Sequence, residues 1–202
     1  MKKLAIVITG ILVYILPIRA QDQEFKTIFQ RDPDKPVFIS GFGGPIMSFT
    51  SIDGHFAHLM GGGGGVIINN FFFGGYGLGL TTSIPYKSEP DHTLDFGHGG
   101  LMCGIILGSN RPVHLSVSSL FGWGNISESD PDIIGLDDIS SYPVFVVTPL
   151  IEVELNFSRF FKVGAGTSMS FVNGTGVEQT TYSVRDFAKP SIFLSFKFGW
   201  FN

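Results

Sequence analysis

Residues 190–202, PSIFLSFKFGWFN, alternate between two kinds of side chain with a period of two. One face collects the large apolar side chains Ile192, Leu194, Phe196, Phe198 and Trp200. The other face is mixed and carries Ser195 and Lys197. Strict alternation over this length predicts a β-strand. The runs 113–123, 142–155 and 160–172 repeat the pattern, and each reaches the roughly 9–11 residues that a tilted membrane-spanning strand requires.

Residues 1–20, MKKLAIVITGILVYILPIRA, have the order of a secretory signal peptide. Lys2 and Lys3 give a positive start, an apolar run follows, and Ala20 precedes the polar QDQEF. We expect cleavage after Ala20; the alternative is an uncleaved membrane anchor, for which the run is short. The expected organisation is a signal peptide at 1–20, a charged N-terminal arm at 21–36 and one domain at 37–202.

The composition is unusual for a soluble exported domain. Hydrophobic residues make up 44% and charged residues 15%, against about 25% charged in a typical domain. No segment after residue 20 offers the ~20 continuous apolar residues of a membrane helix. Cys103 is the single cysteine, so no disulfide forms within the chain. Loss of the three basic leader residues makes the formal charge of −4 more negative, which disfavours nucleic acid as a partner.

The segments 37–50, 55–68, 71–83 and 93–107 complete a set of eight predicted strands. If both termini lie on one side, the second, fourth and sixth connections (NN, GSNRP and NFSRF) lie there too, and all three are short. Three of the other four connections are long and polar, as in outer-membrane barrels. The predicted fold is therefore all-β, an eight-stranded antiparallel transmembrane β-barrel with up-and-down meander topology and a periplasmic arm at 21–36.

The glycine-rich segment 54–80 admits three interpretations. GGGGGV lacks the Gly-Lys-Ser/Thr ending of a phosphate-binding loop, and neither GFGGPI nor GGYGLG has the dinucleotide pattern. A flexible linker fits poorly, because VIINNFFF follows at once. The remaining interpretation places these glycines in strands of a narrow barrel, opposite bulky side chains such as Phe73 or Tyr76. We expect no cofactor.

Four charged residues share the predicted lumen face, and we expect a structural polar network there: Glu152, Glu154, Lys162 and Lys197. If NFSRF forms a five-residue turn, Leu155 pairs with Phe161, and Glu154 lies opposite Lys162. An isolated buried charge is costly, so interior charges pair. A proton or ion path is the alternative interpretation.

His114 and Ser116 lie on one face of their strand, beside Glu152 and Glu154 of the next. Histidine, serine and an acid serve some lipid deacylases, so this group is the candidate for catalysis. Its lumen register and periplasmic position argue against a lipid substrate from the outer leaflet, and we expect no catalytic residue.

No metal site is expected from the sequence. His55 and His58 are three residues apart, which places them on opposite faces of a strand. The connection 124–141 is rich in Asp and Glu but lacks the spacing of a regular calcium loop, so a solvated acidic loop is the simpler interpretation.

Aromatic residues gather near the predicted strand ends, as membrane interfaces select. The periplasmic group comprises Phe71, Phe72, Phe73, Phe160, Phe161, Trp200 and Phe201. The outer group comprises Trp123, Tyr142 and Tyr86.

These features together resemble the small eight-stranded outer-membrane proteins of Gram-negative bacteria. The ending FKFGWF, with Phe198, Gly199, Trp200 and Phe201, is similar to the C-terminal signal read by the barrel-assembly machinery, although Asn202 follows the terminal aromatic residue. The glycine-rich stretch also resembles uncharacterised barrels of the Bacteroidota.

The resemblance implies an outer-membrane location, with lipids, the assembly machinery and other outer-membrane proteins as partners. The expected role is structural or interactive, through surface loops or as a subunit of an envelope complex. The alternatives are an outer-membrane lipid-modifying enzyme and a soluble, secreted, lipocalin-like ligand-binding barrel.

Overall fold

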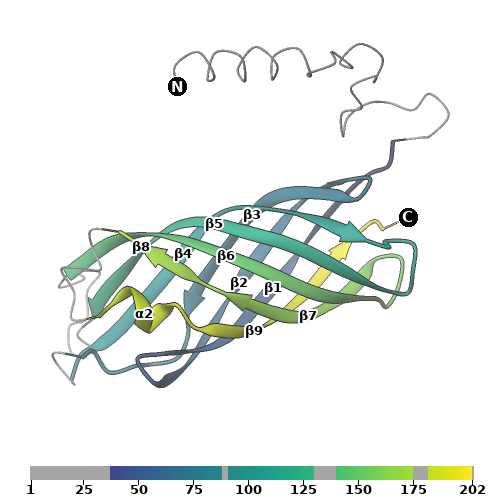
Figure 1. Ribbon diagram of the computed structural model, residues 1–202. Helices are drawn as coiled ribbons and strands as arrows, with labels where there is room; N and C mark the ends of the chain where they lie inside the picture. Colours follow the sequence, from purple (N-terminus) through teal and green to yellow (C-terminus); the bar gives the residue numbers. More distant parts are fainter. Residues whose placement is uncertain (1–36, 88–90, 130–139, 175–181, 202) are drawn as a thin grey trace, which may run out of the picture. The chain divides into compact units, whose positions relative to one another are not determined.

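The computed structural model describes residues 37–87, 91–129, 140–174 and 182–201. The described residues all belong to one compact unit, Val37–Asn202. They form the elements β1 (Ile39–Ile52), β2 (His55–Ile68), β3 (Phe71–Leu80), β4 (Thr93–Leu107), β5 (Val113–Ser129), β6 (Ser140–Asn156), β7 (Phe161–Met169), β8 (Phe171–Asn173), α2 (Val184–Phe187) and β9 (Pro190–Gly199) (Figure 1).

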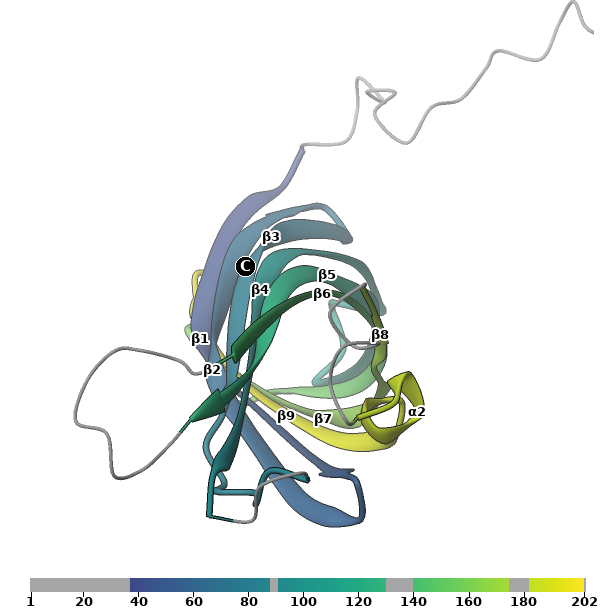
Figure 2. The same cartoon turned by 90° about the vertical axis from the view of Figure 1, so that its left-hand side faces the viewer.

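The strands form a closed antiparallel barrel. The strands β1 to β7 pair in chain order, each with the next. β7 then pairs with β9, and β9 pairs with β1, which closes the sheet. β7 and β8 both pair with β6 and are separated only by Ser170, so they are two parts of one barrel strand. Figure 2 shows the resulting ring. The predicted eight-stranded up-and-down barrel is confirmed.

The two ends of the barrel differ. One end, here called the terminal mouth, holds the start of β1, Phe201, and the three turns at 69–70, 108–112 and 157–160. The opposite end, here called the loop end, holds the turn at 53–54, α2 and the connection that leads into β4. The short connections therefore lie at the end where the barrel chain begins and finishes, as the sequence predicts.

Strand boundaries depart from prediction at the loop end. β2 and β4 have the predicted bounds, but β5 continues to Ser129 and β6 begins at Ser140. The predicted loop at 124–141 is therefore too long, and its remainder, 130–139, lies outside the described residues. The helix α2 was not predicted; its Phe187 is buried against Phe96 and Tyr182.

The register of the β6–β7 hairpin also corrects the prediction. Leu155 pairs with Val163, not Phe161, and Asn156 rather than Glu154 lies opposite Lys162. The turn is shorter than NFSRF because the backbone N–H groups of Phe157 and Ser158 both donate to the carbonyl of Phe161. A shift of two residues leaves every side chain on its predicted face.

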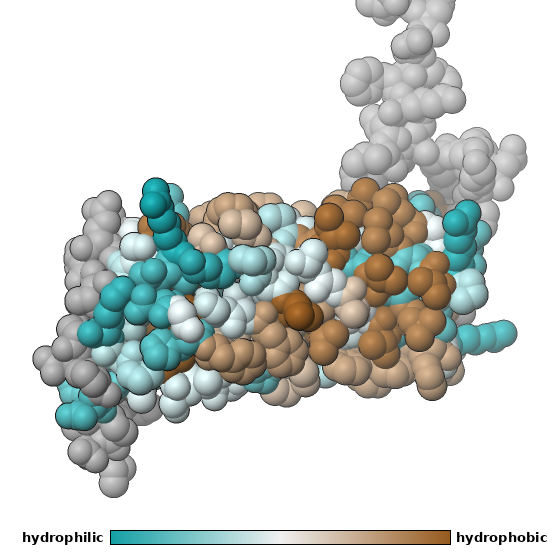
Figure 3. Space-filling model, turned by 60° about the horizontal axis from the view of Figure 1, so that its bottom comes forward, coloured by the Kyte–Doolittle hydropathy of each residue, from teal (hydrophilic) through white to brown (hydrophobic). Residues whose placement is uncertain are grey.

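Side chains alternate between the lumen and the exterior as predicted. On β9, Ile192 and Phe198 point outward and are exposed, whereas Ser195 is buried in the lumen. Figure 3 shows one side of the exterior, where apolar residues gather over the half nearer the terminal mouth and hydrophilic residues over the half nearer the loop end. No helix among the described residues is long and apolar enough to cross a membrane.

Glycine has two separate roles in the wall. Gly122 faces the lumen, where a Cβ atom would collide with the hydroxyl of Tyr76. This is the kind of opposition that was predicted, but at a glycine outside the segment 54–80; within that segment, a Cβ atom on Gly63 would meet Ile46 and Met102 and no aromatic ring. Phe73 does not take part, because its ring points outward and is 48% exposed. Around Gly77 and Gly79 on β3 a Cβ atom would meet nothing within 4 Å, so these positions form bare outer surface.

The aromatic residues are sorted as predicted at most positions. Phe71, Phe73, Phe160 and Trp200 are exposed near the terminal mouth, and Trp123 is exposed on β5 nearer the loop end. Two predictions are wrong. Phe72 points into the lumen, and Tyr86 is buried against Tyr182 in the loop end. Phe72 obeys the alternation of β3, since its neighbours Phe71 and Phe73 point outward, and Tyr86 lies in the connection after β3, to which strand alternation does not apply.

Candidate functional site

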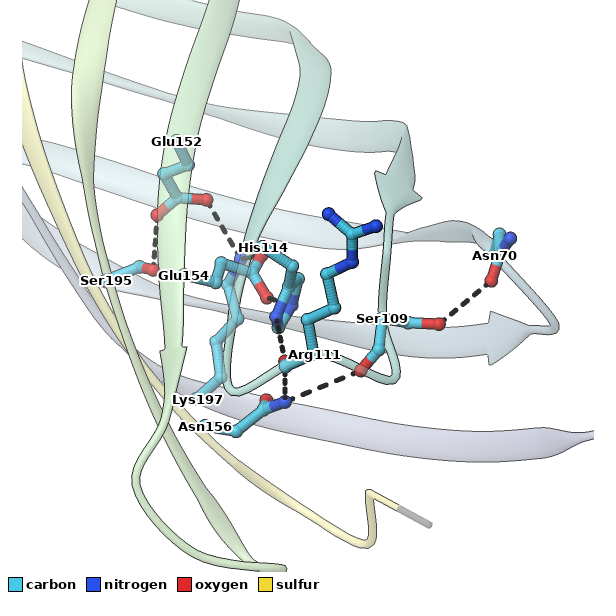
Figure 4. A network of polar contacts seen from close by, with 9 residues as sticks. All are labelled: Asn70, Ser109, Arg111, His114, Glu152, Glu154, Asn156, Ser195 and Lys197. Atoms are coloured by element: carbon cyan, nitrogen blue, oxygen red, sulfur yellow. Dashed lines mark hydrogen bonds and ion pairs between the residues drawn. The ribbon is translucent and has the colours of Figure 1, made fainter.

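The charged lumen face of β6 forms the centre of the polar site in the barrel (Figure 4). Glu152 lies opposite Ser116 of β5, and Glu154 lies opposite His114. On the other side, β9 sends Ser195 and Lys197 into the same space. The site is therefore built from β5, β6 and β9. β5 pairs with β6, and β7 lies between β6 and β9.

Lys197 connects the two carboxylates. Its Nζ lies 2.9 Å from Oε2 of Glu152 and 2.6 Å from Oε1 of Glu154. The second oxygen of each carboxylate is also bonded: Ser195 Oγ donates to Glu152 Oε1 at 2.5 Å, and His114 Nε2 lies 3.0 Å from Glu154 Oε2. Both glutamates are 1% exposed. Buried charges are tolerated when paired and hydrogen-bonded in this way.

A glycine makes room for this arrangement. Gly164 of β7 faces the lumen beside the network, and a Cβ atom there would collide with Oε1 of Glu152 and approach Oγ of Ser195. The alternation of β7 explains why Gly164 faces inward. The carboxylate of Glu152 explains why the residue must be glycine, because it leaves no room for a side chain.

Lys162 lies apart from the other three predicted members of the network. Its pairing partner on β9 is Lys197, and its Nζ lies 4.3 Å from the ring centroid of Phe201. Among the described residues, Lys162 makes no ion pair within 4.0 Å. The structure thus brings together Glu152, Glu154 and Lys197, and it adds His114 and Ser195, which the prediction had not included in the network.

The catalytic candidate lacks the necessary geometry among the described residues. His114 uses Nε2 for Glu154 and approaches the carbonyl of Arg111 with Nδ1 at 3.3 Å. Ser116 Oγ is buried without a hydrogen-bond partner among the described groups. A nucleophile needs a base within hydrogen-bond reach, and the nearest histidine has both ring nitrogens engaged elsewhere.

The described residues contain no cluster of three or more His, Cys, Asp or Glu that could hold a metal ion. His58 stacks on Phe49 and contacts Thr81. Glu128 contacts His92 at 2.6 Å. Most of the acidic segment that was considered for calcium lies outside the described residues.

The C-terminal residues complete the terminal mouth. Phe198 packs on Phe161 and Trp200 on Phe160, both on the exterior. The backbone N–H of Phe201 donates to the carbonyl of Arg159 at 2.9 Å. Recognition of this segment by an assembly machinery stays a prediction.

A cavity of about 470 Å³ in the terminal mouth was not predicted. Its wall comes from β1, from three turns and from the chain end, so no single sequence pattern identifies it. Ser40, Asn69, Asn110 and Arg159 are among its polar residues.

The strands form a closed eight-stranded antiparallel barrel whose interior holds both an apolar core and the carboxylate network. Two solved structures share this fold. Neisserial surface protein A (NspA), from Neisseria, aligns with a TM-score of 0.58 and 13% identity over 83% of this chain and 100% of its own. Ail, the attachment invasion locus protein of Yersinia pestis, was solved with the heparin analogue sucrose octasulfate. It aligns with a TM-score of 0.52 and 16% identity over 82% of this chain and 99% of its own.

Protein-family models and curated protein sequences give no match to this chain. The likeness is therefore one of fold: this chain has the eight-stranded outer-membrane β-barrel fold of NspA and Ail.

Proposed function

We propose that the protein is an outer-membrane β-barrel of a Gram-negative bacterium that acts through contacts with other molecules and not through catalysis. Its signal peptide is cleaved near Ala20, and the arm 21–36 and the terminal mouth face the periplasm. The supporting observation is the apolar exterior of the wall, where Leu101, Trp123 and Ile192 are 62–64% exposed. A soluble lipocalin-like barrel requires the opposite arrangement.

The filled lumen supports a role in contacts over a role in transport. Two cavities inside the barrel measure about 20 Å³ each, which is room for about one water molecule. A small barrel of this kind has an interior that side chains fill. The same crowding, with His114 engaged by Glu154, weighs against a lipid-modifying enzyme.

The loop end is the surface that would meet other molecules outside the cell. The heparin analogue in the Ail structure is a polyanion, which is a poor match for an acidic surface. The loop end here carries Asp53, Asp91, Asp95, Glu128 and Asp186 among the described residues, and like charges repel. A cationic or neutral partner suits this end better.

The orientation is tested by labelling with a membrane-impermeant maleimide in a Cys103→Ser background. We expect Asp91→Cys, at the loop end, to react on intact cells. Ser158→Cys, in a turn of the terminal mouth, should react only after the outer membrane is opened. Equal reaction of both positions on intact cells, or the reverse order, would overturn the proposed topology.

A subunit role in an envelope complex is the second candidate, and the outer wall favours it. Nine outward glycines of β1–β4 form a bare surface, here called the glycine face: Gly41, Gly43, Gly62, Gly64, Gly75, Gly77, Gly79, Gly97 and Gly99. They adjoin across strands, since Gly43 pairs with Gly64 and Gly64 with Gly75. Small residues let membrane proteins approach closely. The glycine-rich wall also supports placement among the glycine-rich barrels of the Bacteroidota.

The substitution Gly77→Leu tests the subunit role, because the site has open space and the barrel itself should tolerate the side chain. We expect the native complex extracted from membranes to become smaller on a native gel. Ala165→Leu, an exposed outward position on β7, is the matched control and should leave the complex unchanged. A complex that is unaffected by Gly77→Leu would exclude the glycine face as its contact surface.

A further inference from the structure

The cavity in the terminal mouth is large enough for a small ligand. Its volume of about 470 Å³ falls in the range of about 300–1,000 Å³ typical of ligand pockets. The lining combines the apolar Phe38, Ile67 and Ile106 with hydroxyl, amide and cationic groups. The lining therefore offers both a surface for an organic group and several hydrogen-bond donors.

Two polar groups at this mouth have no hydrogen-bond partner among the described residues, and one of them is a fully buried atom. Lys162 is 4% exposed and lines the cavity. Its ammonium group rests on the ring of Phe201, and both oxygens of the nearby Glu154 are bonded to His114 and Lys197. Oδ1 of Asn156, another lining residue, is the second such group. A buried acceptor without a partner is costly, and so is an ammonium group without a counter-charge on a side chain that is mostly buried.

The charges around the cavity are predominantly positive. Arg159 lines it, and Arg111 stands in the adjoining turn; neither has an ion-pair partner among the described residues. The carboxylates nearest this end, Glu152 and Glu154, are both committed to Lys197. All other acidic residues in the described part of the barrel lie at the opposite, loop end. The cavity therefore favours an anion.

We propose that the terminal mouth binds the phosphoryl group of a phosphate ester, with Lys162 and Arg159 as its cationic ligands. Two cations match the charge of a phosphate dianion, and a guanidinium presents a planar fork of donors that suits phosphate oxygens. The amide groups of Asn69 and Asn110 and the hydroxyl of Ser158 can donate to the same group. Asn156 Oδ1 accepts a hydrogen bond from a hydroxyl of the esterified alcohol.

The ester can come from two sources with the same chemistry, a water-soluble metabolite or a phospholipid head group. Both are tested on the full mature protein in a phosphate-free detergent. The soluble probe is glycerol 3-phosphate, measured by ³¹P NMR line broadening and calorimetry. The lipid probe is short-chain phosphatidylglycerol, measured by native mass spectrometry. Binding of the soluble ester assigns a metabolite site, and binding of the lipid alone assigns a head-group site.

Two variants locate the site. We expect Lys162→Met and Arg159→Gln each to weaken binding by at least about tenfold, because a charge-assisted hydrogen bond is worth that much or more. Arg185→Gln removes the same charge at the exposed surface of α2, at the loop end, and should leave binding unchanged. Arg159 lies in an exposed turn, so its variant stays informative if Lys162→Met fails to fold.

Two results would overturn the proposal. One is that the folded wild-type protein binds neither probe. The other is that Arg185→Gln weakens binding as much as Arg159→Gln does, which would indicate nonspecific attraction to positive charge.

Discussion

At the scale of single residues, Lys197 has the largest effect on the lumen, because its one ammonium group contacts both buried carboxylates. Ser195 and His114 bond the remaining carboxylate oxygens, so loss of the lysine would leave two adjacent negative charges with neutral or weakly basic partners.

We therefore predict that Lys197→Met lowers the free energy of unfolding by about 3–5 kcal/mol, the usual cost of removing one partner of a buried ion pair. Urea titration of the folded barrel in detergent measures the change. The triple variant that adds Glu152→Gln and Glu154→Gln should recover most of the loss. A Lys197→Met barrel as stable as the wild type would contradict this account of the network.

The sequence predicts which lumen residues face one another but not which of them touch. Alternation correctly places Glu152, Glu154, Lys162 and Lys197 on the inner face. Whether a lysine reaches a given carboxylate depends on the stagger between strands and on the side-chain conformation. For that reason Lys162 was expected in the network, whereas Ser195 was not.

At the scale of elements, the β6–β7 hairpin is the feature whose register prediction was wrong. A five-residue turn and the observed shorter turn put the same side chains on the same faces, so the hydrophobic pattern cannot distinguish them. The difference comes from the backbone hydrogen bonds of Phe157 and Ser158 to Phe161.

Paired cysteines test this register in a Cys103→Ser background. The double variant Leu155→Cys/Val163→Cys should oxidise to a disulfide, because directly opposite Cβ atoms are about 4.5–5.5 Å apart. Leu155→Cys/Phe161→Cys is the control, since diagonal neighbours are about 7–8 Å apart and a disulfide requires about 3.5–4.5 Å. If the control pair oxidises faster on nonreducing gels, Leu155 lies opposite Phe161 and the turn has the five residues NFSRF.

The extensions of β5 and β6 beyond prediction have a physical explanation. Outward positions of these extensions carry polar residues, such as Asn125 of β5 and Ser141 of β6. If a strand is assumed to end where the lipid ends, an outward polar residue is interpreted as part of the following loop. Such residues are compatible with a strand that continues into water, where an outward polar side chain remains solvated.

The elements of the loop end pack around tyrosine. Burial raises the pKa of Tyr86 to about 12, with a further contribution from Glu128. Burial also raises the pKa of Tyr182. Outside the core of this cluster, the hydrogen bond to Asp53 raises the pKa of Lys87.

These shifts predict an alkaline loss of stability. An unfolded chain releases the Tyr86 proton near its ordinary pKa of 10.0, whereas the folded chain holds it to about 12. The unfolded state binds fewer protons in this window, so the free energy of unfolding falls as pH rises through it. Tyr86→Phe should reduce that slope and remove a late component from the absorbance titration at 295 nm. An unchanged slope and titration curve would show that Tyr86 ionises normally.

In the whole molecule, both the charge and the hydrophobicity of the exterior differ between the loop end and the terminal mouth. Among the residues that the structure describes, all acidic residues except Glu152 and Glu154 lie at the loop end, whereas Arg111, Arg159 and Lys162 lie at the terminal mouth. Apolar exterior residues concentrate over the half nearer the terminal mouth (Figure 3). A barrel built this way suits a membrane that covers the apolar half and leaves the loop end in water.

The fold as a whole was predictable because each barrel strand carries its own evidence of alternation, and the turn lengths report the side on which each turn lies. Phe198 and Trp200 illustrate the strand signal, and Asn69–Asn70 the short turn. The cavity of the terminal mouth was not predictable, since its residues come from separate turns whose proximity exists only after closure.

The central claim is that this closed wall lies in the outer membrane with its apolar face toward lipid. The most direct test expresses the full chain with its leader, isolates outer membranes, and compares boiled and unboiled samples on SDS gels. We predict that the protein is found in this fraction and migrates faster unboiled, as a closed barrel that resists detergent. A soluble periplasmic protein with the same mobility in both samples would contradict the claim.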